Sequence, residues 1–326
     1  EQLVDDVLTE LEALIQAPKI DEDYDGPLLF RGTAAAQLLA ATVATQVGGN
    51  PAPLGDAGRA RDFEPLWQDA LDKPVMPSFL DLEDDPRDGF GRYTTDSEGF
   101  AALPLTLVKA GVLRDLLMPR TPNEVRSLSN GRARMSPSLG TGPTISNLTL
   151  KARTRGLSPA QLARELLRRA REDGYEFAYI VETLRDNNLL GPVIRDGATT
   201  YGGGRKVSLP LPARIVRIDA SGKRTLVRGA MFGPMSMRVL RRIRNVSATS
   251  ATVPMRIPPG YNGGFAAETG IDGVLSHTVD VQVTSPEILL DGLEVLLERG
   301  ESERLPVLQH PLRPNQPPPP PAEPDV

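Results

Sequence analysis

The first sixteen residues place apolar side chains at intervals of three and four residues. These side chains are Val4, Val7, Leu8, Leu11, Leu14 and Ile15. Residues at this spacing share one face of an α-helix, and Pro18 follows at a position where it would end the helix. The pattern predicts an amphipathic opening helix. We expect its apolar face to pack against another part of the protein.

A second helix is predicted from the residues that follow Ser158. Ser158-Pro159-Ala160-Gln161 is a capping box with proline at the first helical position, and Gly174 is a stop signal. The two polar side chains of such a box bond backbone groups that the helix end leaves unpaired. The apolar residues of this segment again lie at helical spacing: Leu162, Leu166, Leu167 and Ala170.

A shorter helix is predicted from Ser236 to Val246. Val239, Leu240 and Ile243 face inward in this prediction. Four arginines face mostly outward: Arg238, Arg241, Arg242 and Arg244. The arginines could contact nucleic acid, or they could form a solvated face or an interface with acidic residues of a partner. A net charge of −5 and an aromatic content of 5% favour the second interpretation.

The other apolar segments are short and alternate with polar residues, which is typical of β-strands. Lys109-Ala110-Gly111 and Asp219-Ala220-Ser221-Gly222 have the composition of hairpin turns. Short links favour antiparallel pairing over crossover units. The sequence therefore predicts an α+β fold, with an antiparallel barrel-like or sandwich-like sheet domain and a few flanking helices. The predicted strands are residues 103–108, 112–117, 177–183, 213–218, 224–230 and 277–283.

Length and composition limit the domain organisation. The chain has 326 residues, 40% of them hydrophobic, so it can bury a large core. No stretch approaches the ~20 apolar residues that cross a bilayer, and the first residues lack a signal-peptide pattern. There is no initiator Met, which suggests a start inside a longer protein. We expect a helix over 1–20 that would end a missing N-terminal domain, a main domain over 21–308, and a disordered proline-rich tail over 309–326.

Four segments between Tyr24 and Gly99 follow one another in the order of a family fingerprint. The first two predict a strand, a turn and a helix that has Thr33 as its N-cap and ends at Gly48-Gly49. The four segments are residues 24–30, the Ala-rich run 33–47, Asp84-Asp85-Pro86 and Asp96-Ser97-Glu98-Gly99. Further segments continue the order: Gly111-Val112-Leu113 with Leu116-Leu117, Asn130-Gly131-Arg132-Ala133, Ser146-Asn147-Leu148, Arg228-Gly229-Ala230, Val239-Leu240 with Ile243, and Ser285-Pro286-Glu287-Ile288-Leu289. In this order the chain resembles the C-terminal half of the TldD/PmbA proteins, once named modulators of DNA gyrase and now regarded as zinc peptidases.

The resemblance implies a function related to metallopeptidases. Active family members carry His-Glu-x-x-x-His in their N-terminal half, and a thiolate from the C-terminal half is the third zinc ligand. This chain has no cysteine, and its two histidines, His277 and His310, are far apart. The family's cysteine would fall between Ser250 and Gly273, where no soft ligand occurs. We expect no catalytic residue, no metal site and no cofactor in this chain, with zinc supplied only by an upstream domain or a partner.

Other candidate sites have simpler interpretations. The acidic residues Asp81, Glu83, Asp84 and Asp85 are of a type that binds hard cations, but Asp85-Pro86 is typical of a turn. The glycines after Tyr201 could cradle a phosphate, although the Lys-Ser/Thr and helix of such a loop are missing and a hairpin tip is favoured. Five serines lack a plausible histidine partner for nucleophilic catalysis: Ser127, Ser129, Ser136, Ser138 and Ser146.

The resemblance also implies substrate-binding positions at Glu98, Ser146 and Asn147, which match family motifs and stand beside predicted strands. Two functional classes remain open. The chain is the C-terminal half of a TldD-like enzyme or a non-catalytic TldE-like subunit, or else a non-enzymatic scaffold. In the first class a peptide or unfolded protein would pair with a sheet edge, and the chain would form a homo- or heterodimer with a TldD-like subunit. No nucleic acid or membrane partner is expected, and the expected location is cytoplasmic.

Overall fold

The structure is a computed structural model that describes residues 2–44, 46–49, 67–138, 140–186, 206–207, 209–260 and 270–298. Its helices are α1 (Gln2–Gln16), α2 (Gly32–Leu39), α3 (Pro159–Glu172) and α5 (Gly270–His277), with the short helices η1 (Ala40–Ala44), η2 (Gln68–Ala70) and η3 (Met237–Arg242). The strands of the main sheet are β1 (Leu28–Phe30), β2 (Leu80–Asp84), β3 (Leu105–Lys109), β4 (Val112–Leu113), β7 (Asn147–Ala152), β8 (Phe177–Leu184), β10 (Pro212–Asp219), β11 (Arg224–Val227), β14 (Ile243–Ile257) and β15 (Val279–Leu290). Three small sheets pair β5 (Ala133–Ser136) with β6 (Gly140–Pro143), β9 (Lys206–Val207) with β13 (Met235–Ser236), and β12 (Ala230–Phe232) with β16 (Val295–Leu297).

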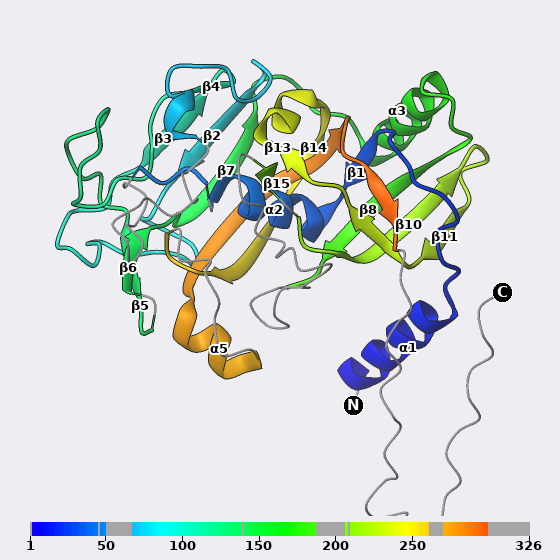
Figure 1. Cartoon of the computed structure of the whole chain (residues 1–326), viewed down its shortest axis with the longest axis horizontal. Coiled ribbons are helices and arrows are strands. Elements are labelled where there is room, and N and C mark those ends of the chain that lie inside the picture. Colours follow the sequence, from blue (N-terminus) through cyan, green and yellow to red (C-terminus); the bar gives the residue numbers. More distant parts are fainter. Residues whose placement is uncertain are drawn as a thin grey trace, which may run out of the picture.

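A ten-stranded sheet organises this part of the chain (Figure 1). Its order is β11-β10-β8-β1-β15-β7-β2-β3-β4, and β14 pairs with β15. The path has ends at β11 and β4, so the described strands do not close into a barrel. The predicted α+β class is confirmed, in its sandwich-like form.

Two strand pairs in the middle of the sheet are parallel. Leu28 of β1 lies opposite Tyr179 of β8, and Asn147 of β7 lies opposite Gln282 of β15. The prediction of antiparallel pairing was wrong for these pairs. It was based on short links between neighbouring strands, whereas these pairs join segments that are far apart in the sequence. The predicted hairpins β3–β4 and β10–β11 are confirmed.

α2 packs against β8, β14 and β15, and its small side chains Ala34, Ala35 and Ala36 are fully buried. The helix begins at Gly32, so the prediction of Thr33 as N-cap was wrong. Arg31 occupies the N-cap position, and its side chain pairs with Glu287 instead of capping the helix. After Leu39 the chain continues as the π-helical turn η1.

The helix predicted from Ser236 to Val246 is only partly present. The segment forms the 3₁₀ helix η3, and β14 begins at Ile243. Ile243 and Val246 pair with Leu290 and Ile288 of β15, and this pairing overrides the helical spacing. His277 was also misassigned to a strand, because it is the last residue of α5 and β15 begins at Val279.

α3 has the predicted capping box at Ser158, and the helix begins at Pro159 as predicted. The Gln161 N–H donates to Ser158 Oγ at 3.3 Å, and the Ser158 N–H donates to Gln161 Oε1 at 2.8 Å. Gly174 follows the helix with φ of 89°, a left-handed conformation that favours glycine.

We predict that Ser158→Ala lowers the free energy of unfolding by about 1 kcal/mol, because it removes one acceptor from the first turn. Urea denaturation followed by circular dichroism measures the change. Ser127→Ala is the control, since Ser127 is exposed and carries no cap. Equal stability of the two variants would contradict the capping role.

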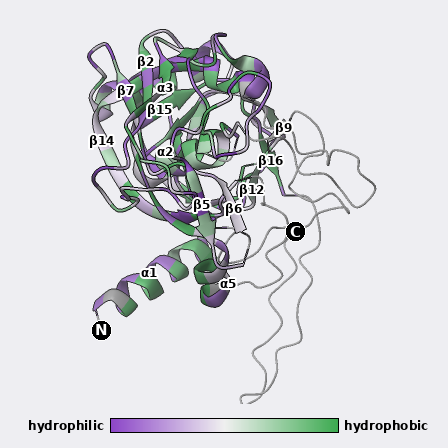
Figure 2. Cartoon of the chain, turned by 90° about the vertical axis from the view of Figure 1, so that its left-hand side faces the viewer, coloured by the Kyte–Doolittle hydropathy of each residue, from purple (hydrophilic) through white to green (hydrophobic). Residues whose placement is uncertain are grey.

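α1 is confirmed as an amphipathic helix, but the expected packing of its apolar face is not seen among the described residues. Val4, Val7, Leu8, Leu11 and Ile15 are each more than half exposed. Figure 2 shows the helix standing apart from the sheet, with its apolar and polar residues on different sides. An ion pair between Glu10 and Arg214, with 3.0 Å between the charged atoms, joins α1 to β10.

Candidate functional site

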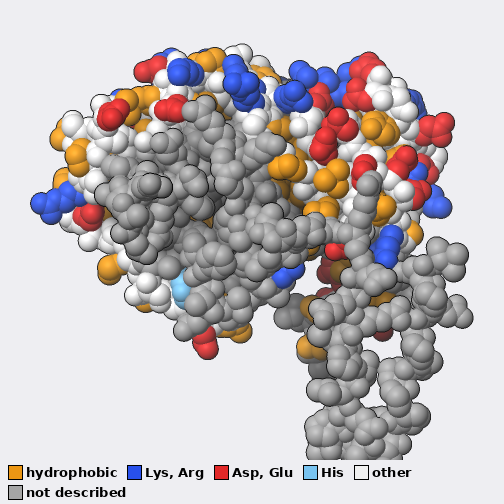
Figure 3. All heavy atoms as spheres, in the orientation of Figure 1, with side chains coloured by type: hydrophobic (Ala, Val, Ile, Leu, Met, Phe, Trp, Pro, Cys, Tyr) orange, Lys and Arg blue, Asp and Glu red, His pale blue; other side chains and the backbone are white. Residues whose placement is uncertain are grey.

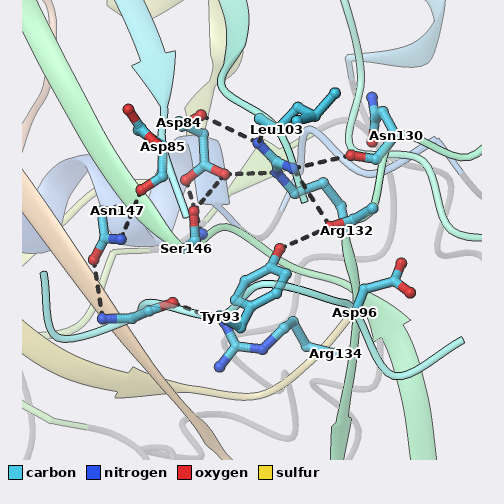
Figure 4. Close-up of polar contacts among 12 residues, drawn as sticks. Asp84, Asp85, Tyr93, Asp96, Leu103, Asn130, Arg132, Arg134, Ser146 and Asn147 are labelled. Atoms are coloured by element: carbon cyan, nitrogen blue, oxygen red, sulfur yellow. Dashed lines mark hydrogen bonds and ion pairs between the residues drawn. The ribbon is translucent and has the colours of Figure 1, made fainter. Parts of the chain in front are cut away.

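A buried arginine lies at the centre of a polar network where β2 ends and β5 and β7 begin (Figure 4). Arg132 and Asp84 are both fully buried, and Arg132 Nε donates to Asp84 Oδ2 at 2.7 Å. The two Nη groups of Arg132 donate to the carbonyl oxygens of Asn130, Gly131, Asp84 and Leu103. These bonds use every donor of the guanidinium, as burial of a charge requires.

Ser146 completes the surroundings of the Asp84 carboxylate. Its backbone N–H donates to Asp84 Oδ1, and its hydroxyl donates to Asp84 Oδ2, both at 2.8 Å. Ser146 is fully buried. Its hydroxyl proton is therefore directed at a carboxylate inside the protein. The side chain is part of the network in this structure, and its expected contact with a substrate stays a prediction.

Asn147 holds the loop that follows β2. Its Nδ2 donates to the carbonyl oxygens of Asp85 and Asp88, and its Oδ1 accepts from the Gly91 N–H at 2.9 Å. A Cβ at position 91 would lie 2.3 Å from the carbonyl oxygen of Ser146, so only glycine fits there. Asn147 is buried as well, and its expected substrate contact also stays a prediction.

Asp96 shapes the turn that carries Glu98. Its Oδ1 accepts from the N–H groups of Glu98 and Phe100 at 3.0 and 2.9 Å, and its Oδ2 accepts from the Ala133 N–H at 3.0 Å. Glu98 is only partly buried, and its carboxylate accepts from the Arg120 N–H. The network thus brings Ser146 and Asn147 together, while Glu98 is joined to it through Asp96 and is the least buried of the three.

Tyr93 and Arg134 lie next to the Asp84–Arg132 pair (Figure 4). The Tyr93 hydroxyl donates to the Gly131 carbonyl at 2.8 Å, and the Arg134 guanidinium lies 4.5 Å from the centre of the Tyr93 ring. Burial raises the pKa of Tyr93 to about 12 and lowers the pKa of Arg134 from its ordinary value. Tyr93 is therefore a neutral hydrogen-bond donor at physiological pH.

Two residues of the acidic group predicted near β2 have structural roles. Asp85 Oδ1 accepts from the Arg87 N–H at 3.1 Å, which confirms the predicted turn at Asp85-Pro86. Asp81 Oδ1 accepts from the Ala110 N–H at 2.6 Å, and Asp81 Oδ2 accepts from Lys109 Nζ at 2.9 Å. Asp81 thereby stabilises the β3–β4 turn, in which Ala110 has an unusual positive φ of 48°.

We predict that Asp81→Asn lowers the free energy of unfolding by about 1 kcal/mol at pH 7. Burial would raise the pKa of Asp81, but the bonds from Lys109 and Ala110 hold it below its ordinary value. The contribution of the carboxylate is therefore complete above the unfolded-state pKa and is lost as the pH falls through the folded-state pKa. In urea denaturation the difference from wild type should shrink below about pH 4. A difference that stays constant down to pH 3 would contradict this role.

Zinc does not fit the donor groups of the described residues. No group of three or more His, Cys, Asp or Glu side chains lies together there in a way that could hold a metal ion. Both Asp84 oxygens are used by Arg132 and Ser146. His277 Nδ1 lies 2.9 Å from the Gly273 carbonyl oxygen and 2.7 Å from Ser276 Oγ. His310, the Tyr201–Arg205 segment and the 309–326 tail lie outside the described residues.

Comparison with protein families decides the relationship. Residues 25–177 match the PmbA/TldA metallopeptidase C-terminal domain. Over these residues, just under half of its length, the chain is similar to the TldD/PmbA family. The match includes every residue of the network around Arg132, from Asp84 to Asn147. The resemblance inferred from the motifs is therefore confirmed.

Solved structures of TldD/PmbA type share the fold. TldE from Thermococcus kodakarensis matches with a TM-score of 0.54 and 14% identity, over 90% of this chain and 55% of that protein. A Thermotoga maritima protein named as a modulator of a DNA gyrase matches with a TM-score of 0.53 and 17% identity, over 88% and 53%. The chain thus spans about half the length of these relatives. Such low identities show the fold alone.

No curated protein sequence gives a significant match. Within the described ranges, no helix combines the length and the apolar character needed to cross a membrane.

Sequence reasoning missed the central residue of the network. Arg132 was singled out only as part of the Asn130-Gly131-Arg132-Ala133 motif, and Asp84 only as one of several crowded carboxylates. The signal in the sequence that could have identified Arg132 and Asp84 was that both lie in segments that match the family order. Their pairing depends on the fold, because 48 residues separate them in the sequence.

Proposed function

We propose that this chain is the peptide-holding, non-catalytic part of a TldD/PmbA-type metallopeptidase system. It acts either as the C-terminal half of such an enzyme or as a TldE-like subunit that pairs with a TldD-like partner, in proteolysis or peptide processing. The family match over residues 25–177 is the observation that carries the proposal. The lack of zinc-binding side chains supports the non-catalytic role, since the sequence has no cysteine and only two histidines, which are far apart. Zinc would come from an upstream domain or from the partner.

The edge of β14 supports the binding of an extended peptide. Between Ser250 and Ile257 this strand pairs with β15, and no other described strand pairs with it there. An unpaired edge offers backbone N–H and C=O groups to an incoming strand. Thr252 and Pro254 are exposed along it, and Pro254 lies opposite Gln282, which in turn lies opposite Asn147. The edge is therefore two strands away from the network.

Within this proposal the three predicted residues have different roles. Glu98, whose side chain is partly exposed, contacts the peptide directly. Ser146 and Asn147 are positioning residues, because their side chains fix Asp84 and the loop up to Gly91. The proposed cytoplasmic location has no bearing on these roles.

An activity measurement tests whether this chain is non-catalytic and depends on a zinc-binding partner or domain. The purified chain alone should contain no stoichiometric zinc by elemental analysis and should not cleave an unstructured peptide such as casein fragments. Addition of a family member that carries His-Glu-x-x-x-His should produce chelator-sensitive cleavage, and a Glu→Gln variant of that motif should abolish it. Chelator-sensitive cleavage by the chain alone would overturn the proposal. Formation of the complex without any effect on cleavage would favour the scaffold.

Photocrosslinking tests the peptide site independently. A photoreactive amino acid at the position of Thr252 should crosslink to an added unstructured peptide. The same group at Ser221 should not, because Ser221 is also exposed but lies in the turn between β10 and β11, which offers no strand edge. Equal crosslinking at both positions would refute a site at β14.

A further inference from the structure

Arginine side chains from two distant segments meet at the end of β15. Arg169 Nη1 of α3 and Arg244 Nε of β14 lie 3.3 and 2.5 Å from the same oxygen, Asp291 Oδ2. The Arg242 side chain packs over the next residue, where a Cβ at Gly292 would lie 2.0 Å from Arg242 Nη1. Two guanidinium groups therefore share one carboxylate, and a third lies beside the residue that follows it.

More positive charge lies beside this point than the carboxylates neutralise. We define the arginine cluster as Arg168, Arg169, Arg241, Arg242 and Arg244. Glu165 and Glu172 pair with Arg168, Glu165 and Asp291 pair with Arg169, and Asp291 also pairs with Arg244. Asp173, the C-cap residue of α3, is a fourth carboxylate near the cluster. Arg241 and Arg242 are exposed, and neither has a carboxylate partner among the described residues. Figure 3 shows Lys and Arg side chains, with Asp and Glu side chains between them, along the upper edge of the molecule, where Figure 1 places α3 and the start of β14.

The charge of this surface is opposite to that of the whole chain. The net charge of the protein is −5, so a local excess of arginine produces a field that differs from the rest of the surface. Guanidinium groups bind carboxylates through two parallel hydrogen bonds, and Asp291 already holds Arg169 and Arg244 in place.

We propose that the arginine cluster is a docking surface for an acidic segment of a partner protein. Nucleic acid is the less suitable ligand, because neither α3 nor η3 contains an aromatic residue on which a base could stack. The exposed Arg241 and Arg242 make the new contacts, and Asp291 positions the others. This inference concerns a surface separate from the peptide site proposed at residues 250–257 of β14, and it does not depend on that site.

A fluorescein-labelled polyglutamate peptide of about ten residues is the probe, and fluorescence anisotropy at low salt is the measurement. We expect saturable binding that weakens as salt screens the charges. Arg241→Glu combined with Arg242→Glu should weaken binding at least ten-fold, since like charges then face the peptide. Arg92→Glu combined with Arg120→Glu is the matched control. It changes the net charge equally on exposed arginines between β2 and β5 and should alter binding less than two-fold.

Thermal melting should show that both double variants remain folded, and Arg241→Gln with Arg242→Gln replaces the first if it does not. Equal weakening by both double variants would overturn the inference, because the affinity would then depend on the net charge of the protein and not on the position of the arginines. Tighter binding of a thymidine oligonucleotide with the same charge would overturn it in favour of nucleic acid.

Discussion

Arg132→Met is expected to lower the free energy of unfolding by about 3–5 kcal/mol, since removing one member of a buried ion pair leaves the other charge unpaired. Asp84 is fully buried and would keep only its bonds to Ser146. Four carbonyl acceptors would also lose their donor. Urea denaturation followed by circular dichroism measures the loss.

Two comparisons make this result specific. Arg114→Met also breaks an ion pair, but Arg114 and Asp72 are both exposed, so the loss should stay below about 1 kcal/mol. The double variant Asp84→Asn with Arg132→Met should cost less than the two single changes added together, because it removes both charges. If Arg132→Met were as mild as Arg114→Met, the network would not stabilise the fold.

Gly91→Ala should destabilise the protein by about 1–3 kcal/mol, the usual cost of forcing an extra carbon into a packed site. The new methyl group would lie 2.3 Å from the carbonyl oxygen of Ser146, the residue before β7, and 3.0 Å from Val281 Cα of β15. Backbone atoms of a sheet cannot move aside, so the loop should shift and lose its bond to Asn147. Hydrogen exchange should show reduced protection of the Gly91 amide.

Gly233→Ala is the control for this change. The nearest atoms to a Cβ there belong to the Glu294 side chain: Oε2 at 2.8 Å, which can rotate away, and Cβ at 3.1 Å, which needs a shift of only a few tenths of an ångström. We expect a loss smaller than that of Gly91→Ala, because no backbone atom is among these nearest neighbours. Equal effects of the two variants would show that the close approach at Gly91 is unimportant.

The elements that the sequence predicted correctly are those that depend on neighbouring residues. α3 follows from a capping box of four residues, and the β3–β4 hairpin follows from a turn of three. The parts that could not be predicted depend on distant partners. The spacing of Ile243 and Val246 is compatible with a helix, but in the fold both residues pair with β15 and form a strand.

The candidate site shows the same limit. Glu98, Ser146 and Asn147 were identified as polar residues beside strands, and the structure does place them in or next to one network. The burial of Ser146 could not be predicted, because it depends on an Asp84 carboxylate 62 residues away. The hydrogen-bond acceptors of Arg132 belong to four different residues of the chain. No local sequence pattern predicts that they lie together.

The position of β1 determines when the molecule can fold. This strand of three residues lies between Tyr179–Val181 of β8 and Ile288–Leu290 of β15. The centre of the sheet is thus incomplete until β15 has left the ribosome. Contacts of such long sequence separation slow folding, because a long loop must close before they form. A nascent chain that is still short of β15 would expose the apolar residues of β1, and it is the species that a chaperone would bind.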